Sequence, residues 1–146
     1  MVTVSEVSDI ESLENVQRRF TKRIFGLYNL TYHQRLIRLD LESLELRRLR
    51  FDLLLVYKIV FGLTGLRSED FFRMNVNRNV LNLRGHPYQL FHNVSKTSVR
   101  NTFFANRIVC IWNNLRLDAC VFNSFKQFEQ SLTTNILATL CRVNFN

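Results

Sequence analysis

Four cations fall within nine residues of the chain, in the stretch VQRRFTKRI at positions 16–24. Lys and Arg side chains bind phosphate oxygens, and the planar guanidinium of Arg does so through two parallel N–H groups. At about 100° per residue, the four project within roughly 140° on one side of a helix. The four are Arg18, Arg19, Lys22 and Arg23. We interpret them as candidate contacts to the phosphate backbone of a nucleic acid.

More candidates follow close behind in the sequence. Arg35, Arg38 and Arg50 extend the cationic set, and Tyr28 and Tyr32 are candidates for stacking on bases. Arg47 and Arg48 have two open interpretations, because Glu42, Glu45 and Asp52 lie within a helical turn of one or both. They either form structural ion pairs or contact nucleic acid. The other aromatic residues, such as Tyr57 and Trp112, fall on apolar stripes and are predicted to lie in the core.

The overall charge agrees with a polyanionic partner. The 146 residues carry 20 Lys and Arg against 12 Asp and Glu, which gives a net charge of +8. Residues 1–15 hold four acids and no cation, whereas residues 16–50 hold nine cations and three acids. Sixteen of the cations are Arg, which favours nucleic acid, although acidic proteins and membrane surfaces use the same attraction.

The sequence offers no reaction centre. The three Cys and three His residues lack the short spacings of a zinc site, and no Gly-rich phosphate loop or nucleophile motif is present. We therefore expect no catalytic residue, no metal, no cofactor and no small-molecule substrate. The acidic N-terminus does not resemble a secretory signal, and no apolar run is long enough to cross a bilayer. Together with the odd number of Cys residues, this predicts an intracellular protein, nuclear or cytoplasmic, without a membrane partner.

The elements that position these residues are helices. A first helix is expected over residues 9–27, capped by Ser8, Asp9 or Ser12. Its apolar residues share a sector of roughly 80° that should face the core; they are Leu13, Val16, Phe20, Ile24 and Leu27. Thr31 and Gln34 form a capping box for a second helix, and Asp40 or Ser43 caps a third that runs to about Val60.

The rest of the chain divides less regularly. The second half of the third helix, FDLLLVYKIVF, is apolar almost all round and is predicted to be the central buried helix, ended by Gly62 and Gly65. SEDFF at 68–72 is a candidate short helix, and 74–96 is expected to be irregular or extended. Helical spacing resumes after residue 98, and Ser124 can cap a last helix. The core residues expected there are Val99, Phe103, Ile108, Ile111, Trp112 and Leu115.

The predicted fold class is therefore mainly α, a compact single domain over 1–146 with about five to six helices. Residues 10–65 hold the basic helices and the buried helix, and 66–98 form an irregular connection. Residues 99–133 hold C-terminal helices, and 134–146 form a tail.

Several segments resemble one family. LENVQRRFTKRIFGL and YHQRLIRLDLESLELRRLRFDLLLVYKIVFGL are similar to the region after the polymerase core in jockey-type non-LTR (LINE) retrotransposon reverse transcriptases. The segments EDFF, LRGHPYQL, VRNTFFANRIVCIWNNL and SFKQFEQSL continue the resemblance in the same order, so that it spans roughly residues 10–132. The chain departs from the family pattern at Arg116, where the family has Pro, and the tail beyond Leu132 lies outside the resemblance.

The resemblance implies a thumb-like fragment of an RNA-directed DNA polymerase. The family holds its metal ions with a YxDD-type aspartate pair, which this chain lacks together with the endonuclease residues. The fragment is therefore expected to be no enzyme but to bind RNA or an RNA–DNA hybrid by its backbone, with the missing polymerase core as a further partner. Two alternatives stay open: a helical protein-interaction domain, and a decayed transposon remnant without activity.

Overall fold

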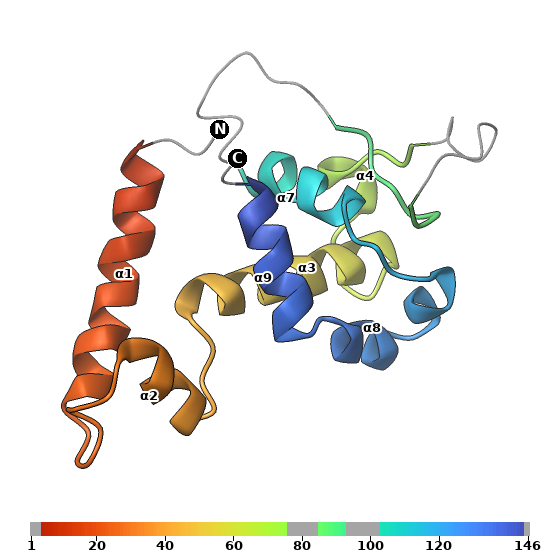
Figure 1. Cartoon of the computed structure of the whole chain (residues 1–146). Coiled ribbons are helices and arrows are strands. Elements are labelled where there is room, and N and C mark those ends of the chain that lie inside the picture. Colours follow the sequence, from red (N-terminus) through yellow and green to blue (C-terminus); the bar gives the residue numbers. More distant parts are fainter. Residues whose placement is uncertain (1–3, 76–84, 93–102, 145–146) are drawn as a thin grey trace.

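The computed structural model is mainly α-helical, as the sequence predicts, and describes residues 4–75, 85–92 and 103–144 (Figure 1). Residues 74 and 90 form an isolated antiparallel bridge, and these described ranges contain no longer strand. The core candidate Val99 and most of the irregular segment at 74–96 lie outside the described residues. The helices are α1 (Val4–Lys22), α2 (Tyr32–Arg38), α3 (Leu44–Val60), α4 (Ser68–Phe71), α7 (Phe104–Asn113), the 3₁₀-helix η1 (Ala119–Asn123), α8 (Phe125–Ser131) and α9 (Thr134–Asn144).

Three of the predicted helix starts are confirmed. The Thr31 hydroxyl accepts from the backbone N–H of Gln34, whose side chain accepts in return from the Thr31 N–H, so the capping box of α2 is complete. Ser43 caps α3 and Ser124 caps α8, each by accepting from the backbone N–H three residues later. Local side chain-to-backbone bonds of this kind are encoded within four residues of sequence.

The predicted limits of the first helix are wrong at both ends. Helix α1 begins at Val4, so the proposed caps Ser8, Asp9 and Ser12 lie inside it. It ends at Lys22, and Gly26 lies in the following turn with φ of +79°, a conformation that favours glycine. The predicted tail at 134–146 contains a further helix, α9, over Thr134–Asn144.

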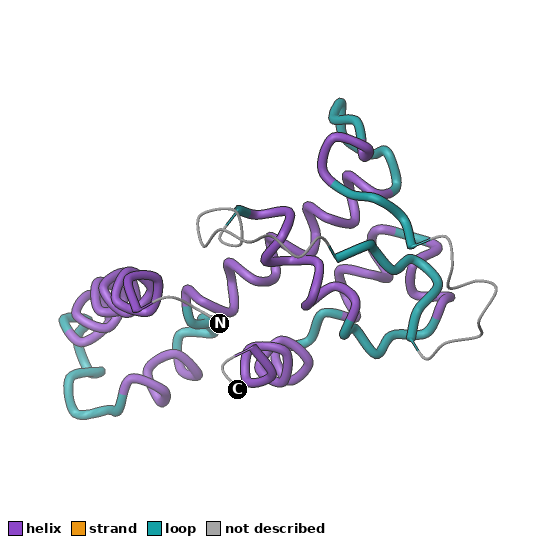
Figure 2. Tube along the Cα trace, turned by 90° about the horizontal axis from the view of Figure 1, so that it is seen from above, coloured by secondary structure: helices purple, strands orange, loops and turns teal. Residues whose placement is uncertain are grey.

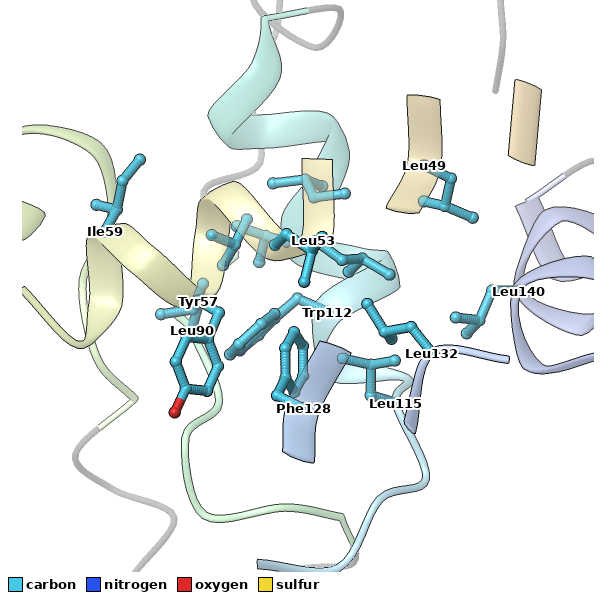
Figure 3. Close-up of a cluster of buried hydrophobic side chains, with 14 of the residues drawn as sticks. Leu49, Leu53, Tyr57, Ile59, Leu90, Trp112, Leu115, Phe128, Leu132 and Leu140 are labelled. Atoms are coloured by element: carbon cyan, nitrogen blue, oxygen red, sulfur yellow. The ribbon is translucent and has the colours of Figure 1, made fainter. Parts of the chain in front are cut away.

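The core lies around the second half of α3, as predicted. Helices α7, α8 and α9 pack against α3, and Figure 3 shows Trp112 and Phe128 among the leucines of these elements. Trp112, Phe122 and Phe128 are fully buried, and Tyr57 stacks on Phe128 with ring centroids 4.7 Å apart. Of the other predicted core residues, Ile108 and Leu115 are buried, Ile111 packs at the edge of the core, and Phe103 is exposed. Phe103 is the residue directly before α7 and is 58% exposed.

Helices α1 and α2 form a separate layer at one end of the molecule. Helix α1 contacts α2 and α3. Figures 1 and 2 show it at the far side of α2 from α7 and α8. One side of α1 is therefore held by the fold, while most of its circumference faces outward.

Candidate nucleic-acid interface

A row of polar side chains holds α1 on its neighbours. Glu14 accepts from the Tyr32 hydroxyl through Oε1 and from the Leu44 backbone N–H through Oε2, the latter at 2.9 Å. The Gln17 amide donates to the Glu42 carbonyl oxygen at 3.0 Å, and the Thr21 hydroxyl accepts from Arg35. These three residues of α1 lie at spacings of three and four and so share one side of the helix. We call this contact the polar seam: Glu14, Gln17 and Thr21 with Tyr32, Arg35, Glu42 and Leu44.

Arg35 is the buried centre of the polar seam. Only 4% of its surface is exposed. Its Nε donates to Thr21 Oγ1 at 3.1 Å, and its Nη2 donates to the carbonyl oxygen of Arg18 at 3.2 Å. A third bond, from Nη1, reaches the carbonyl oxygen of Leu30. The prediction that Arg35 contacts nucleic acid is wrong for this reason: its guanidinium is enclosed and satisfied by the chain itself.

Tyr32 also belongs to the seam. Its hydroxyl donates to Glu14, and its ring lies beneath the guanidinium groups of Arg18 and Arg35, 5.1 and 5.6 Å from the ring centroid. Burial and the neighbouring Glu14 carboxylate raise the pKa of Tyr32 to about 12, so the hydroxyl keeps its proton. Tyr32 is partly buried with two cations near its ring, and its stacking on a base stays a prediction.

Arg50 likewise has a structural partner. Its guanidinium pairs with the Glu42 carboxylate and donates to the carbonyl oxygen of Leu132, which ties the start of α3 to the end of α8. The hydrogen bond from Arg50 lowers the pKa of Glu42 below its usual value. Arg50 is therefore held in an intramolecular ion pair, and its contact with nucleic acid stays a prediction. Arg47 is half-buried and Arg48 exposed, and the structure pairs neither with an acid within its described part.

Three cations of the opening stretch, Arg19, Lys22 and Arg23, lie away from the seam, and Arg18 lies at its edge with its guanidinium over the Tyr32 ring. Arg18, Arg19, Lys22 and Arg23 are all exposed, and within the described ranges none of them forms an ion pair. Arg18 Nη1 donates to Asn15 Oδ1 at 2.9 Å, and its guanidinium carbon is 5.1 Å from the centroid of the Tyr32 ring. We call this set the cationic side of α1. Arg38, at the end of α2, is exposed as well.

The turn after α1 presents two aromatic rings. Phe25 is 99% exposed and Tyr28 is 62% exposed, while Leu27 between them is buried and anchors the turn. Backbone bonds from Leu27 N–H to the Ile24 oxygen and from Leu30 N–H to the Leu27 oxygen, both 3.1 Å, fix its path. We call Phe25 and Tyr28 the aromatic tip. Tyr28 was a predicted stacking residue, but Phe25 was missed, although at 100° per residue it falls outside the apolar sector of the helix.

The apolar sector of α1 faces outward, which overturns the predicted orientation. Leu13, Val16 and Phe20 are 59%, 66% and 68% exposed, and we call them the apolar stripe. Ile24 is half-buried, and only Leu27 reaches the interior. The physical reason is that α2 offers Tyr32 and Arg35 to α1, and these polar groups select the side of α1 that can hydrogen-bond to them.

Neither a metal cluster nor a membrane span is found in the part of the chain that the structure describes. No three His, Cys, Asp or Glu side chains there converge as metal ligands. None of its helices combines the length and the apolar character that crossing a bilayer requires.

Comparison with protein families, with curated proteins and with solved structures finds no match to this chain. The candidate interface therefore rests on the exposure and the contacts of the residues described above.

Proposed function

We propose that this chain is a non-catalytic nucleic-acid-binding module that contacts the backbone of RNA or of an RNA–DNA hybrid through the cationic side of α1. The observation that carries the proposal is the exposure of Arg19, Lys22 and Arg23 at the end of a helix that the polar seam holds on another side, with Arg18 exposed at the edge of the seam. Because the backbone of the helix is already ordered, binding phosphates has to order only the cationic side chains, and these contacts position a strand without reading its sequence.

The aromatic tip supports the same function. Phe25 and Tyr28 are exposed in the turn that follows Lys22 and Arg23 in the sequence. An exposed ring next to cations is the arrangement that binds single-stranded nucleic acid, where bases stack on aromatic faces while phosphates meet cations. We propose that the cationic side holds the backbone and that the aromatic tip stacks on an unpaired base at the end of a duplex.

The resemblance to the thumb region of non-LTR retrotransposon reverse transcriptases supports this proposal from the sequence. On this proposal, the chain binds nucleic acid for an RNA-directed DNA polymerase but does not carry the catalytic carboxylates of that enzyme. The polymerase core is then a further partner. The protein then acts inside the cell, in the nucleus or cytoplasm.

The experiment compares two triple variants of equal charge. Arg19→Gln, Lys22→Gln and Arg23→Gln remove part of the cationic side, whereas Arg67→Gln, Arg73→Gln and Arg116→Gln remove three exposed cations elsewhere. Fluorescence anisotropy measures binding to an RNA duplex, an RNA–DNA hybrid and polyglutamate. We expect the first variant to lose at least about tenfold in affinity for both nucleic acids, and the control to change by less than about twofold. Equal losses in the two variants, or tighter binding to polyglutamate than to either nucleic acid, contradict the proposal.

The aromatic tip is tested separately. Phe25→Ala is expected to weaken binding to a duplex with a single-stranded overhang by about 1–3 kcal/mol, the usual contribution of one stacked base. Phe91→Ala serves as the control, because Phe91 is also exposed but lies far along the chain from α1. A blunt duplex should not distinguish the variants. If Phe25→Ala leaves overhang binding unchanged, the tip takes no part.

A further inference from the structure

The outward side of α3 carries large apolar side chains that the core does not use. Phe51 is 62% exposed and Leu55 is 39% exposed, and they lie one helical turn apart. On the opposite side of the same helix, Leu49, Leu53 and Tyr57 lie in the core (Figure 3). The apolar character of α3 therefore continues onto a side of the helix that is open to solvent.

The exposed side of α3 forms a regular row. Exposed or half-buried residues follow each other along it at spacings of four, three, four and three. At 100° per residue they lie within roughly 80° of the helix circumference. We call them the outer row of α3: Leu44, Arg48, Phe51, Leu55 and Lys58. A row with this spacing presents one continuous line of side chains to a second helix.

The charges of the outer row are all positive. Arg48 is exposed, and the acid one turn further along, Asp52, is engaged on the other flank, where it accepts from Arg107 Nη2 at 2.5 Å. The Lys58 ammonium lies 4.8 Å from the centroid of the Phe125 ring, a contact that holds it in place. The outer row therefore has an apolar centre, a cation before and after that centre, and no acid of its own.

We propose that the outer row of α3 docks one acidic amphipathic helix of a partner protein. The apolar side chains of that helix pack on Phe51 and Leu55, as in other contacts between an amphipathic helix and a protein surface. Its carboxylates meet Arg48 and Lys58 at the two ends of the contact, which fixes its register. The inference goes beyond the proposed function, because it concerns another helix and a protein partner.

Charge complementarity selects this occupant. A second copy of the chain, packed row on row, would place cations on cations, which is unfavourable. A nucleic-acid backbone has no apolar groups to cover Phe51 and Leu55, which separate Arg48 from Lys58 by about 15 Å along the helix axis. A membrane surface is bound by a broader apolar face than these two side chains provide. An acidic amphipathic helix satisfies both the apolar centre and the cations.

A synthetic peptide probes the outer row. It has about 15 residues, with Leu at spacings of four and three, Glu at the flanking positions and Ala elsewhere, so that it forms an amphipathic helix. Fluorescence anisotropy with the full chain should show binding in the micromolar range, as expected for a small interface. A scrambled peptide of the same composition should bind at least about tenfold more weakly. No binding of the amphipathic peptide, or equal binding of the scrambled one, overturns the proposal.

Variants of the chain locate the contact. Phe51→Gln and Leu55→Gln are each expected to weaken peptide binding by about tenfold. Phe20→Gln is the matched control, because Phe20 is 68% exposed on α1 beside a different set of cations. It should change the affinity by less than about twofold. Circular dichroism confirms that each variant keeps its helical content. If Phe20→Gln weakens binding as much as Phe51→Gln does, the peptide docks on α1 and the proposal fails.

A charge exchange tests the role of the cations. Arg48→Glu is expected to weaken binding of the Glu peptide by about tenfold and to improve binding of the same peptide with Lys in place of Glu. Arg116→Glu, at an exposed position outside α3, should change neither affinity by more than about twofold.

The other occupants are tested with the Phe51→Gln variant. RNA-duplex binding, binding to anionic vesicles and self-association in sedimentation should be the same for this variant and the wild-type chain. A loss of any one of the three would show that the outer row contacts that occupant instead, and would refute the acidic-helix proposal.

Discussion

The polar seam under α1 and the core around α3 hold the molecule together by different means. In the core, the rings of Trp112, Phe122 and Phe128 pack on each other with centroids 5.3–5.7 Å apart. All three side chains are fully buried. In the seam, a buried guanidinium and a few hydrogen bonds fix one helix on another. The core stabilises the fold by removing apolar area from water, whereas the seam mainly fixes orientation.

This difference between the seam and the core explains which side chains of α1 are exposed to solvent. A helix that docked through its apolar stripe would bury Leu13, Val16 and Phe20. Its cations would then face in a different direction relative to the rest of the molecule. Docking through Glu14, Gln17 and Thr21 leaves both the apolar stripe and the cationic side exposed. The seam therefore gives α1 two free surfaces.

Removing the centre of the core should have the largest effect. Trp112 is fully buried, and its indole Nε1 donates to the carbonyl oxygen of Tyr88 at 2.7 Å. Trp112→Ala is expected to lower the free energy of unfolding by about 3–5 kcal/mol, because it leaves a cavity and an unpaired carbonyl. Urea titration measures the change, with the exposed Phe51→Ala as the control. A loss below about 1 kcal/mol would mean that the core is not where the stability resides.

Breaking the seam should have a smaller and more local effect. Arg35→Met keeps the length of the side chain but leaves Thr21 and the carbonyl oxygens of Arg18 and Leu30 without their donor. We expect a loss of about 2–3 kcal/mol that is confined to α1 and α2. Hydrogen exchange should show faster exchange of α1 amides and unchanged exchange in α3 and α7. Uniform acceleration across all helices would indicate that seam and core are one cooperative unit.

The ion pair between Glu42 and Arg50 should have the smallest effect, and one that depends on pH. The hydrogen bond from Arg50 lowers the pKa of Glu42 from its usual 4.5, so the folded state favours the carboxylate. This stability is present above pH 4.5 and is lost as the pH falls through the lowered pKa. Glu42→Gln should therefore cost about 1 kcal/mol at pH 7 and progressively less in acid.

The control for Glu42→Gln is Glu129→Gln, which removes the same charge at an exposed position of α8. Urea unfolding at pH 7 and pH 3 should show a shrinking difference only for Glu42→Gln. A cost that stays constant between the two pH values would show that Arg50 does not favour the charged form.

The sequence predicts the parts of this structure that are encoded locally. Thr31, Ser43 and Ser124 cap their helices through bonds to backbone three residues away, and the apolar run of α3 predicts a central helix that is buried except at Phe51 and Leu55. The orientation of α1 could not be predicted in this way, because the two sides of an amphipathic helix do not reveal what its neighbour offers. In the sequence, Arg35 looks like one more exposed cation of a basic stretch. Only its hydrogen bonds to Thr21 and Leu30 in the structure show that it is buried.

The same limit applies to the candidate site. The cationic side was identified from spacing alone, since Arg18 to Arg23 lie within one and a half turns of helix. The sequence does not reveal the partners of Arg50 and Tyr32, because Glu42 and Glu14 lie 8 and 18 residues away from them in the sequence. Phe25 was missed because its exposure depends on how the turn after α1 is held.

The salt dependence of RNA binding tests the central claim most directly, namely that the polar seam holds α1 so that its cations meet phosphates. The slope of log affinity against log salt should fall by about 2–3 in the Arg19→Gln, Lys22→Gln, Arg23→Gln variant, since each lost phosphate contact removes about 0.7–0.9. The Arg67→Gln, Arg73→Gln, Arg116→Gln control should keep the wild-type slope. Equal slopes in all three proteins would contradict the account.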